Sequence, residues 1–147
     1  MLTTHAASGT KLGLTITLLT LFFITSSLQA ASFENMDKFT GSWAGIVTDK
    51  NDESIRTIFE ITKNPSGVPP HQFQLIFKTP RSCRLQAEEL LTDDKQLILK
   101  FYKASGGFCD KLYKGQLTLD IKDKKTLSAT IERKSKNINE TATLKRQ

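Results

Sequence analysis

Apolar and polar residues alternate in short runs along most of the chain, and segments rich in turn-forming residues separate these runs. Alternation with a period of two places every second side chain on the same face of an extended strand. In the clearest run, Leu117, Leu119 and Ile121 are separated by polar residues. The pattern predicts eight strands, at residues 43–47, 55–61, 72–78, 83–91, 96–101, 113–121, 127–131 and 138–144.

The connections between these runs favour an antiparallel meander. They are polar, rich in Asp, Asn, Gly, Ser and Pro, and too short to hold a crossover helix. Only residues 33–39, ahead of the first strand, show a weak helical pattern. Closing the meander would remove both unpaired sheet edges. We therefore expect an all-β fold in one domain, an eight-stranded antiparallel up-and-down barrel.

The first thirty residues have the pattern of an export signal. Lys11 is the only charged residue before position 34, an apolar run follows at 12–24, and small residues lead to Ala30 and Ala31. These are the parts of a secretory signal peptide. An uncleaved membrane anchor is the alternative, but the apolar run is shorter than the roughly 20 residues that a bilayer requires. We expect a signal peptide at 1–30, a barrel domain at 31–147, and a secreted or periplasmic protein.

Export changes how the two cysteines are interpreted. Cys83 and Cys109 allow only one intramolecular pairing, and an oxidising compartment favours it. A reactive thiol or half of a metal site is the alternative, but their spacing matches no zinc pattern. In a meander, the disulfide would join the loop between strands five and six to the start of strand four.

Several short motifs carry a resemblance to a known fold family. Gly41-Ser-Trp43-Ala-Gly45 opens the first strand, and Arg146 lies near the chain end. With the eight-strand meander, they resemble the calycin-like barrels, the lipocalin and avidin group. The resemblance implies that Trp43 closes one barrel end and packs near Arg146. The chain is also similar to small exported bacterial two-cysteine domains of uncertain function that open with Gly-x-Trp-x-Gly.

The strand pattern also indicates what fills the barrel and what could meet a ligand. We expect a largely filled interior, so a ligand would enter at one mouth shaped by loops 64–71 and 104–112. Candidate contacts are Phe108 and Tyr113, together with Glu89 and Glu140, which take the inward parity of their strands. A bulge would turn both carboxylates to water instead. The expected interior residues are Trp43, Phe59, Phe73, Phe77, Leu99, Phe101, Leu117 and Leu119.

The chemistry-bearing residues are few. His71 is the only histidine after the signal segment, and without an accompanying nucleophile signature we expect it to be exposed in a loop. Asp93 and Asp94 fall in a predicted hairpin turn, where aspartate is common. Asn139 opens an Asn-Glu-Thr glycosylation pattern, which matters only in a eukaryotic source. We expect no catalytic centre, metal or cofactor.

The excess positive charge is confined to the end of the chain. Residues 34–121 hold twelve basic and twelve acidic side chains, whereas residues 122–147 hold eight basic and three acidic ones, a net charge of +5. These C-terminal strands would give a weak contact to an anionic surface, or only keep the sheet soluble. Nucleic acid is not expected as a partner of an exported chain that lacks a basic and aromatic stripe.

Two functions fit these observations. The first is an exported, non-catalytic, monomeric domain that binds a small ligand or a protein partner. The second is an inhibitor of an exported hydrolase, in which residues 31–38 would plug the enzyme as the N-terminal strand does in periplasmic metalloprotease inhibitors that such barrels resemble. A weak hydrolase that uses Glu89 is the third and least favoured.

Overall fold

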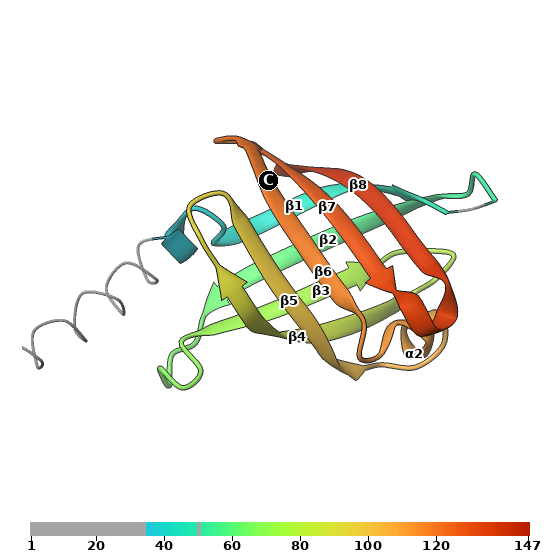
Figure 1. Ribbon diagram of the computed structural model, residues 1–147, viewed down its shortest axis with the longest axis horizontal. Coiled ribbons are helices and arrows are strands. Elements are labelled where there is room, and N and C mark those ends of the chain that lie inside the picture. The colour runs from blue at the N-terminus through green and yellow to red at the C-terminus, as the bar shows by residue number, and fades with distance from the viewer. Residues whose placement is uncertain (1–34, 50) are drawn as a thin grey trace, which may run out of the picture.

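The chain folds into a closed antiparallel barrel of eight strands that are paired in sequence order (Figure 1). The computed structural model describes residues 35–49 and 51–147, so the expected signal peptide and its cleavage point lie outside the described residues. The all-β barrel fold predicted from alternation is confirmed. The strands are β1 (Gly41–Thr48), β2 (Ser54–Lys63), β3 (His71–Phe77), β4 (Cys83–Thr92), β5 (Gln96–Ala104), β6 (Gln116–Asp123), β7 (Thr126–Arg133) and β8 (Ile138–Arg146).

The apolar face of each strand points into the barrel. In β3, for example, Phe73, Leu75 and Phe77 are buried while the polar residues between them are not. All eight residues expected in the interior are buried, and Phe59, Leu99, Phe101 and Leu117 have no exposed surface. Side chains of the described residues therefore fill the barrel along its axis.

Closure of the barrel depends on a close approach between β1 and β8. Gly45 is in register with Leu144, and a Cβ atom added to it would lie 2.2 Å from the carbonyl oxygen of Thr143. That distance is far inside van der Waals contact, so any side chain at position 45 would push the last strand away from the first. The second glycine of the Gly-x-Trp-x-Gly motif thus has a structural role.

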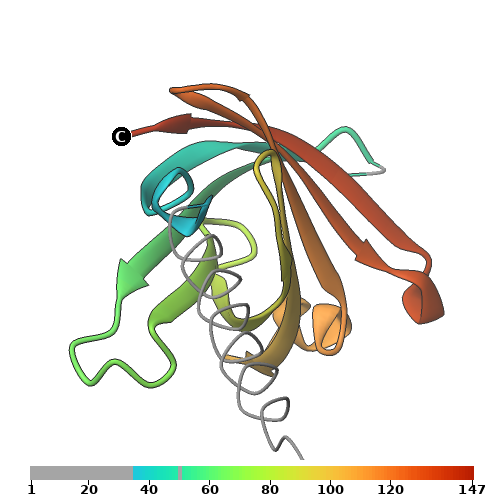
Figure 2. The ribbon, with the colours of Figure 1, turned by 60° about the vertical axis from the view of Figure 1, so that its left-hand side comes forward.

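One end of the barrel is closed by Trp43 and the segment before β1. Residues 35–37 form a helical turn, and Phe39 after it is fully buried. The indole Nε1 of Trp43 donates a hydrogen bond to the carbonyl oxygen of Phe39 at 2.7 Å, and the guanidinium carbon of Arg146 lies 4.1 Å from the indole centroid. Figure 2 shows the turn and the C-terminal end of β8 at this same end.

The guanidinium of Arg146 joins the last strand to the segment that precedes β1. Its nitrogens donate to the carbonyl oxygens of Thr40 at 2.7 Å and of Lys38 at 2.8 Å. Gly41, with a φ of 125°, leaves the space for it, because an added Cβ atom would lie 2.9 Å from Nη1 of Arg146. The motif residues at this end therefore form one contact group around Trp43.

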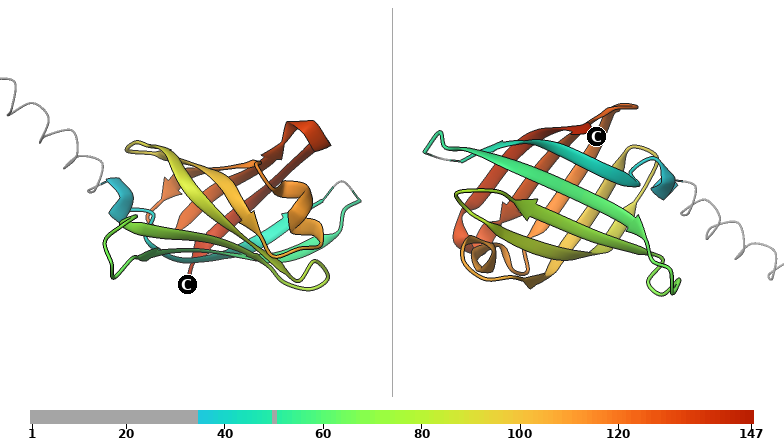
Figure 3. Two further views of the ribbon diagram at one scale, coloured as in Figure 1. Left: turned by 90° about the horizontal axis from the view of Figure 1, so that it is seen from below. Right: turned by 180° about the vertical axis from the view of Figure 1, so that it is seen from behind.

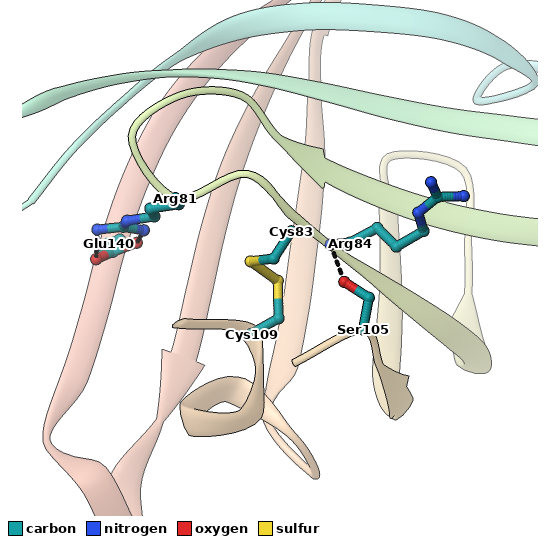
Figure 4. Close-up of a disulfide and its surroundings, with 6 residues drawn as sticks. All are labelled: Arg81, Cys83, Arg84, Ser105, Cys109 and Glu140. Atoms are coloured by element: carbon teal, nitrogen blue, oxygen red, sulfur yellow. Dashed lines mark hydrogen bonds and ion pairs between the residues drawn. A yellow bond between two sulfur atoms is a disulfide. The ribbon is translucent and has the colours of Figure 1, made fainter. Parts of the chain in front are cut away.

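The opposite end is covered by a short helix that the strand pattern did not predict. The helix α2 (Phe108–Leu112) lies between β5 and β6 and buries Cys109 and Leu112 (Figures 1 and 3). Cys83 and Cys109 form a disulfide with a Cα–Cα distance of 6.0 Å, so the expected link between this connection and the start of β4 is confirmed (Figure 4). Beside it, the backbone N–H of Arg84 donates to Oγ of Ser105 at 2.9 Å. Within the described part of the chain, no helix is long and apolar enough to cross a membrane.

Candidate functional site

Two hollows lie at different ends of the barrel. The first, of about 660 Å³, is bordered by the connection between β2 and β3, and the second, of about 540 Å³, is bordered by α2. The two loops expected to share one mouth, 64–71 and 104–112, are therefore at opposite ends, and that prediction is wrong (Figure 3). The reason is strand order: the chain crosses the barrel three times, along β3, β4 and β5, between the first loop and the second, and an odd number of crossings ends at the opposite side.

The larger hollow forms where β3 and β4 separate. Their pairing ends at Phe73 opposite Ala87, although β3 begins two residues earlier and β4 continues to Thr92. In the left view of Figure 3, the yellow end of β4 rises away from green β3 toward β5. The side chains that line the hollow come from both the inner and the outer face of the strands. The hollow therefore opens in the barrel wall and reaches residues that face the interior. The lining consists of Glu60, Thr62, Pro69, Pro70, His71, Gln72, Phe73, Gln74, Gln86, Ala87, Glu88, Glu89 and Tyr102.

His71 is buried in this lining, contrary to the expectation of an exposed loop histidine. Only 6% of its surface is exposed, because β3 begins at His71 and not one residue later. It pairs with Lys63 of β2 and takes the inward parity of Phe73. Two prolines immediately before it concealed this extension of the alternating pattern.

The imidazole of His71 has an unused hydrogen-bonding atom. Its Nε2 is buried, and no group in the described part of the chain forms a hydrogen bond with it. Burial lowers the pKa of His71 from its ordinary 6.5, and the charge of nearby Glu89 opposes this shift only in part. The side chain is therefore neutral at pH 7, with one ring nitrogen that can accept a hydrogen bond and one that can donate.

Three carboxylates share this hollow with His71. Glu60, Glu88 and Glu89 line it, and within the described residues none of the three forms an ion pair. Glu89 is opposite Leu99 of β5, which is the expected inward parity, but its side chain is exposed because β4 has left β3 at that point. Its Oε1 accepts a hydrogen bond from Thr92 at 2.5 Å.

The rest of the lining is amide and aromatic. Gln72, Gln74 and Gln86 supply side-chain amides, and the Tyr102 hydroxyl donates to Oε1 of Gln86 at 3.2 Å. Tyr102 is at the bulge between β4 and β5, where the register shifts beside Gln86, and half of its surface is exposed. The hollow thus combines polar groups with an exposed aromatic ring.

The second hollow is organised by a buried ion pair. Both terminal nitrogens of Arg81 donate to the carboxylate of Glu140 at 2.6 Å (Figure 4). One of these nitrogens also lies 3.8 Å from a carboxylate oxygen of Asp49. The guanidinium carbon also lies 3.6 Å from the ring centroid of Phe108. The side chains of Arg81 and Glu140 are 6% and 8% exposed. Glu140 is therefore inward and buried, but its charge is already compensated.

The four candidate contact residues do not form one site. Glu89 lines the larger hollow, Phe108 and Glu140 line the smaller one, and Tyr113 lines neither, with 42% of its surface exposed. Arg81 was missed because its partner is 59 residues away and no local pattern links the two. His71 had a usable signal, since it lies two positions before Phe73 on the same face of an alternating run.

The residues of the two hollows do not make a metal centre. In the described ranges 35–49 and 51–147, no group of three or more His, Cys, Asp and Glu side chains is arranged to hold a metal ion.

No model of a known protein family matches the chain, and no curated protein matches it. The site is thus characterised by its own geometry.

Proposed function

We propose that this protein is an exported, non-catalytic domain that binds a small ligand at the hollow between β3 and β4. The observation that carries the proposal is His71, which is 6% exposed, lines the hollow, and has an Nε2 atom without a hydrogen-bond partner in the described residues. Leaving such a buried atom unsatisfied costs about 1–3 kcal/mol. A ligand that supplies the missing hydrogen bond recovers this energy on binding.

The dimensions of the hollow support a small molecule as the ligand. Its volume of about 660 Å³ lies in the range of known small-molecule sites, roughly 300–1,000 Å³. Its lining has the mixture that such sites use, with apolar contacts from Phe73 and Tyr102 and a few polar groups for orientation. Because the barrel interior is packed, we place the ligand in the wall and not on the barrel axis.

Two further observations favour binding over the alternatives. Both cysteines are joined in the disulfide, so neither is a thiol nucleophile, and the disulfide is consistent with an extracellular or periplasmic location. An inhibitor would need residues 31–38 to extend into an enzyme. Residues 31–34 lie outside the described part, but Met36 is only 2% exposed, so the described half of that segment packs against the barrel.

The test is to map binding of a chemically diverse fragment library by NMR on isotope-labelled protein without its first 30 residues. We expect hits whose amide shifts centre on residues 71–74 and 86–89. We expect the His71→Leu variant, which removes the ring nitrogens, to weaken these hits. Thr57→Val is the matched control, because Thr57 is also buried and polar but its Oγ1 donates to the carbonyl oxygen of Ile55. Hits that map elsewhere, or that His71→Leu leaves unchanged, contradict the proposal.

A further inference from the structure

We infer that the hollow between β3 and β4 takes an organic cation, a protonated amine attached to an apolar or aromatic group. This inference rests on the proposed function and adds the chemical class of the ligand. It is drawn from the charges, the hydrogen-bonding capacity and the ring contacts of the lining.

The charge of the lining is opposite to that of the chain. The protein has 21 Lys and Arg against 15 Asp and Glu, yet the hollow is lined by three glutamates, Glu60, Glu88 and Glu89, and by no lysine or arginine. Like charges gathered around a concave surface raise the local concentration of ions of the opposite sign. A cation is therefore attracted to this surface, and an anion is repelled from it.

In the described residues, the basic side chains in register with residues of the hollow form no ion pair with the three carboxylates. Lys63 is in register with His71, but its Nζ lies 3.2 Å from Asp37 and it does not line the hollow. Lys100 is in register with Glu88 and forms no ion pair in the described residues. By contrast, the buried Glu140 at the other hollow has its own arginine. The carboxylates beside His71 remain available to an incoming cation.

The hydrogen-bonding capacity of His71 points the same way. As a neutral imidazole it offers a lone pair on one ring nitrogen, and an ammonium group has N–H donors and needs no acceptor in return. With the proton on Nδ1, Nε2 accepts one of these N–H bonds. A carboxylate or phosphate ligand would instead need several donors and would meet three negative charges, so the same site disfavours it.

The apolar part of the lining explains why the cation should be organic. Phe73, Tyr102, Pro69 and Pro70 line the hollow beside the carboxylates. Aromatic faces attract cations and also pack against apolar groups. A bare metal ion would make no apolar contact with these side chains, and the described residues offer no group of three ligating side chains to hold one.

The experiment compares three aromatic probes of similar size and different charge: benzylammonium, benzyl alcohol and benzoate. Each is titrated into the labelled domain at pH 7.5, and the shifts of residues 71–74 and 86–89 are followed. Probes of this size have dissociation constants on the order of 1 mM. We expect benzylammonium to bind at least about tenfold more tightly than benzoate, with benzyl alcohol in between, and we expect added salt to weaken only benzylammonium binding.

Charge-neutral variants locate the effect. Because these carboxylates are partly exposed, we expect Glu89→Gln and Glu60→Gln each to weaken benzylammonium binding by about 2- to 5-fold and to leave benzyl alcohol unchanged. Glu132→Gln is the matched control, since Glu132 is on β7 and does not line the hollow. Equal binding of the three probes, or tightest binding of benzoate, overturns the inference but leaves the proposed function standing. If neither these probes nor the fragment library binds at the hollow, both proposals fail.

Discussion

The buried pair of Arg81 and Glu140 allows a sharp test of what holds the second end of the barrel together. The change is Glu140→Gln, which keeps the shape of the side chain and removes its charge. In the native protein, the two residues form a two-pronged contact with both N–O distances at 2.6 Å, and both side chains are less than 10% exposed. The variant leaves the guanidinium buried beside Asp49 at 3.8 Å and the rings of Phe108 and Phe77, with a neutral amide in place of the carboxylate.

The expected magnitude follows from comparing attraction with desolvation. Two unit charges about 4 Å apart attract by about 4 kcal/mol at an effective dielectric constant of about 20. Removing one partner of a buried pair typically costs 3–5 kcal/mol, because the other charge stays buried without compensation. Asp49 supplies part of that compensation, so we expect Glu140→Gln to lower the free energy of unfolding by about 3 kcal/mol. Replacing both residues, as Arg81→Met with Glu140→Leu, removes the desolvation cost together with the attraction. We expect the double variant to lie within about 2 kcal/mol of the native protein.

The assay is urea unfolding followed by the fluorescence of Trp43, the only tryptophan, which lies at the opposite end of the barrel and so reports global unfolding. Glu53→Gln is the control, because Glu53 lines the same hollow but is exposed, and its substitution should change stability by less than about 0.5 kcal/mol. A loss below about 1 kcal/mol for Glu140→Gln would mean that the pair behaves as a solvent-exposed one. A double variant as unstable as the sum of its single changes would refute the claim that desolvation offsets attraction here.

Three further predictions concern stability and its dependence on pH. Replacing Cys83 and Cys109 by serine reopens a 26-residue loop, and the chain-entropy estimate is a loss of about 3.5 kcal/mol, which should lower Tm by roughly 15 °C in calorimetry. His71→Leu removes a buried unsatisfied atom and should raise the free energy of unfolding by about 1–3 kcal/mol. Burial holds the pKa of native His71 below 6.5, so the unfolded chain binds this proton first. The free energy of unfolding of the native protein should therefore fall as the pH drops from 6.5 through the folded-state pKa of His71. Urea unfolding at several pH values measures this loss, and the His71→Leu variant should lack the part of it that His71 causes. Arg146→Lys loses two hydrogen bonds to backbone carbonyls and the stacked contact with Trp43, and should cost about 1–3 kcal/mol in urea unfolding, with an altered Trp43 emission in the folded state.

Most of the barrel could be predicted from the sequence because its main determinant is local. Alternation in runs such as Phe73, Leu75 and Phe77 assigns inward faces, and short connections allow only antiparallel neighbours. The prediction of a strand from 113 failed at its start, since β6 begins at Gln116 and α2 precedes it. Five residues are too few to show helical periodicity, so this element was hidden in an apparent loop.

The candidate site was harder to predict because its features depend on contacts between distant segments. Glu140 was recognised as inward by parity, but its arginine lies 59 residues earlier in a loop. The alternating pattern also placed Glu89 on the inward-facing side of its strand. The pattern does not show, however, whether a neighbouring strand is present to cover the side chain. The prediction that His71 is exposed was wrong because His71 lies at the boundary of its strand, where two prolines interrupt the alternating pattern.

These outcomes suggest where binding residues should be sought in a barrel whose interior is filled. A polar residue of inward parity is covered wherever neighbouring strands stay paired, and it must then be satisfied within the protein, as Glu140 is by Arg81. Beyond the last residue pair of two neighbouring strands, a residue on the inward-facing side of its strand can instead border a hollow where a ligand could bind. His71 and Glu89 both lie past the last pair of the β3–β4 ladder, which has only five residue pairs, whereas β7 and β8 share eight. At the end of the β3–β4 ladder, and not on the barrel axis, this protein therefore places inward-facing polar groups beside a hollow.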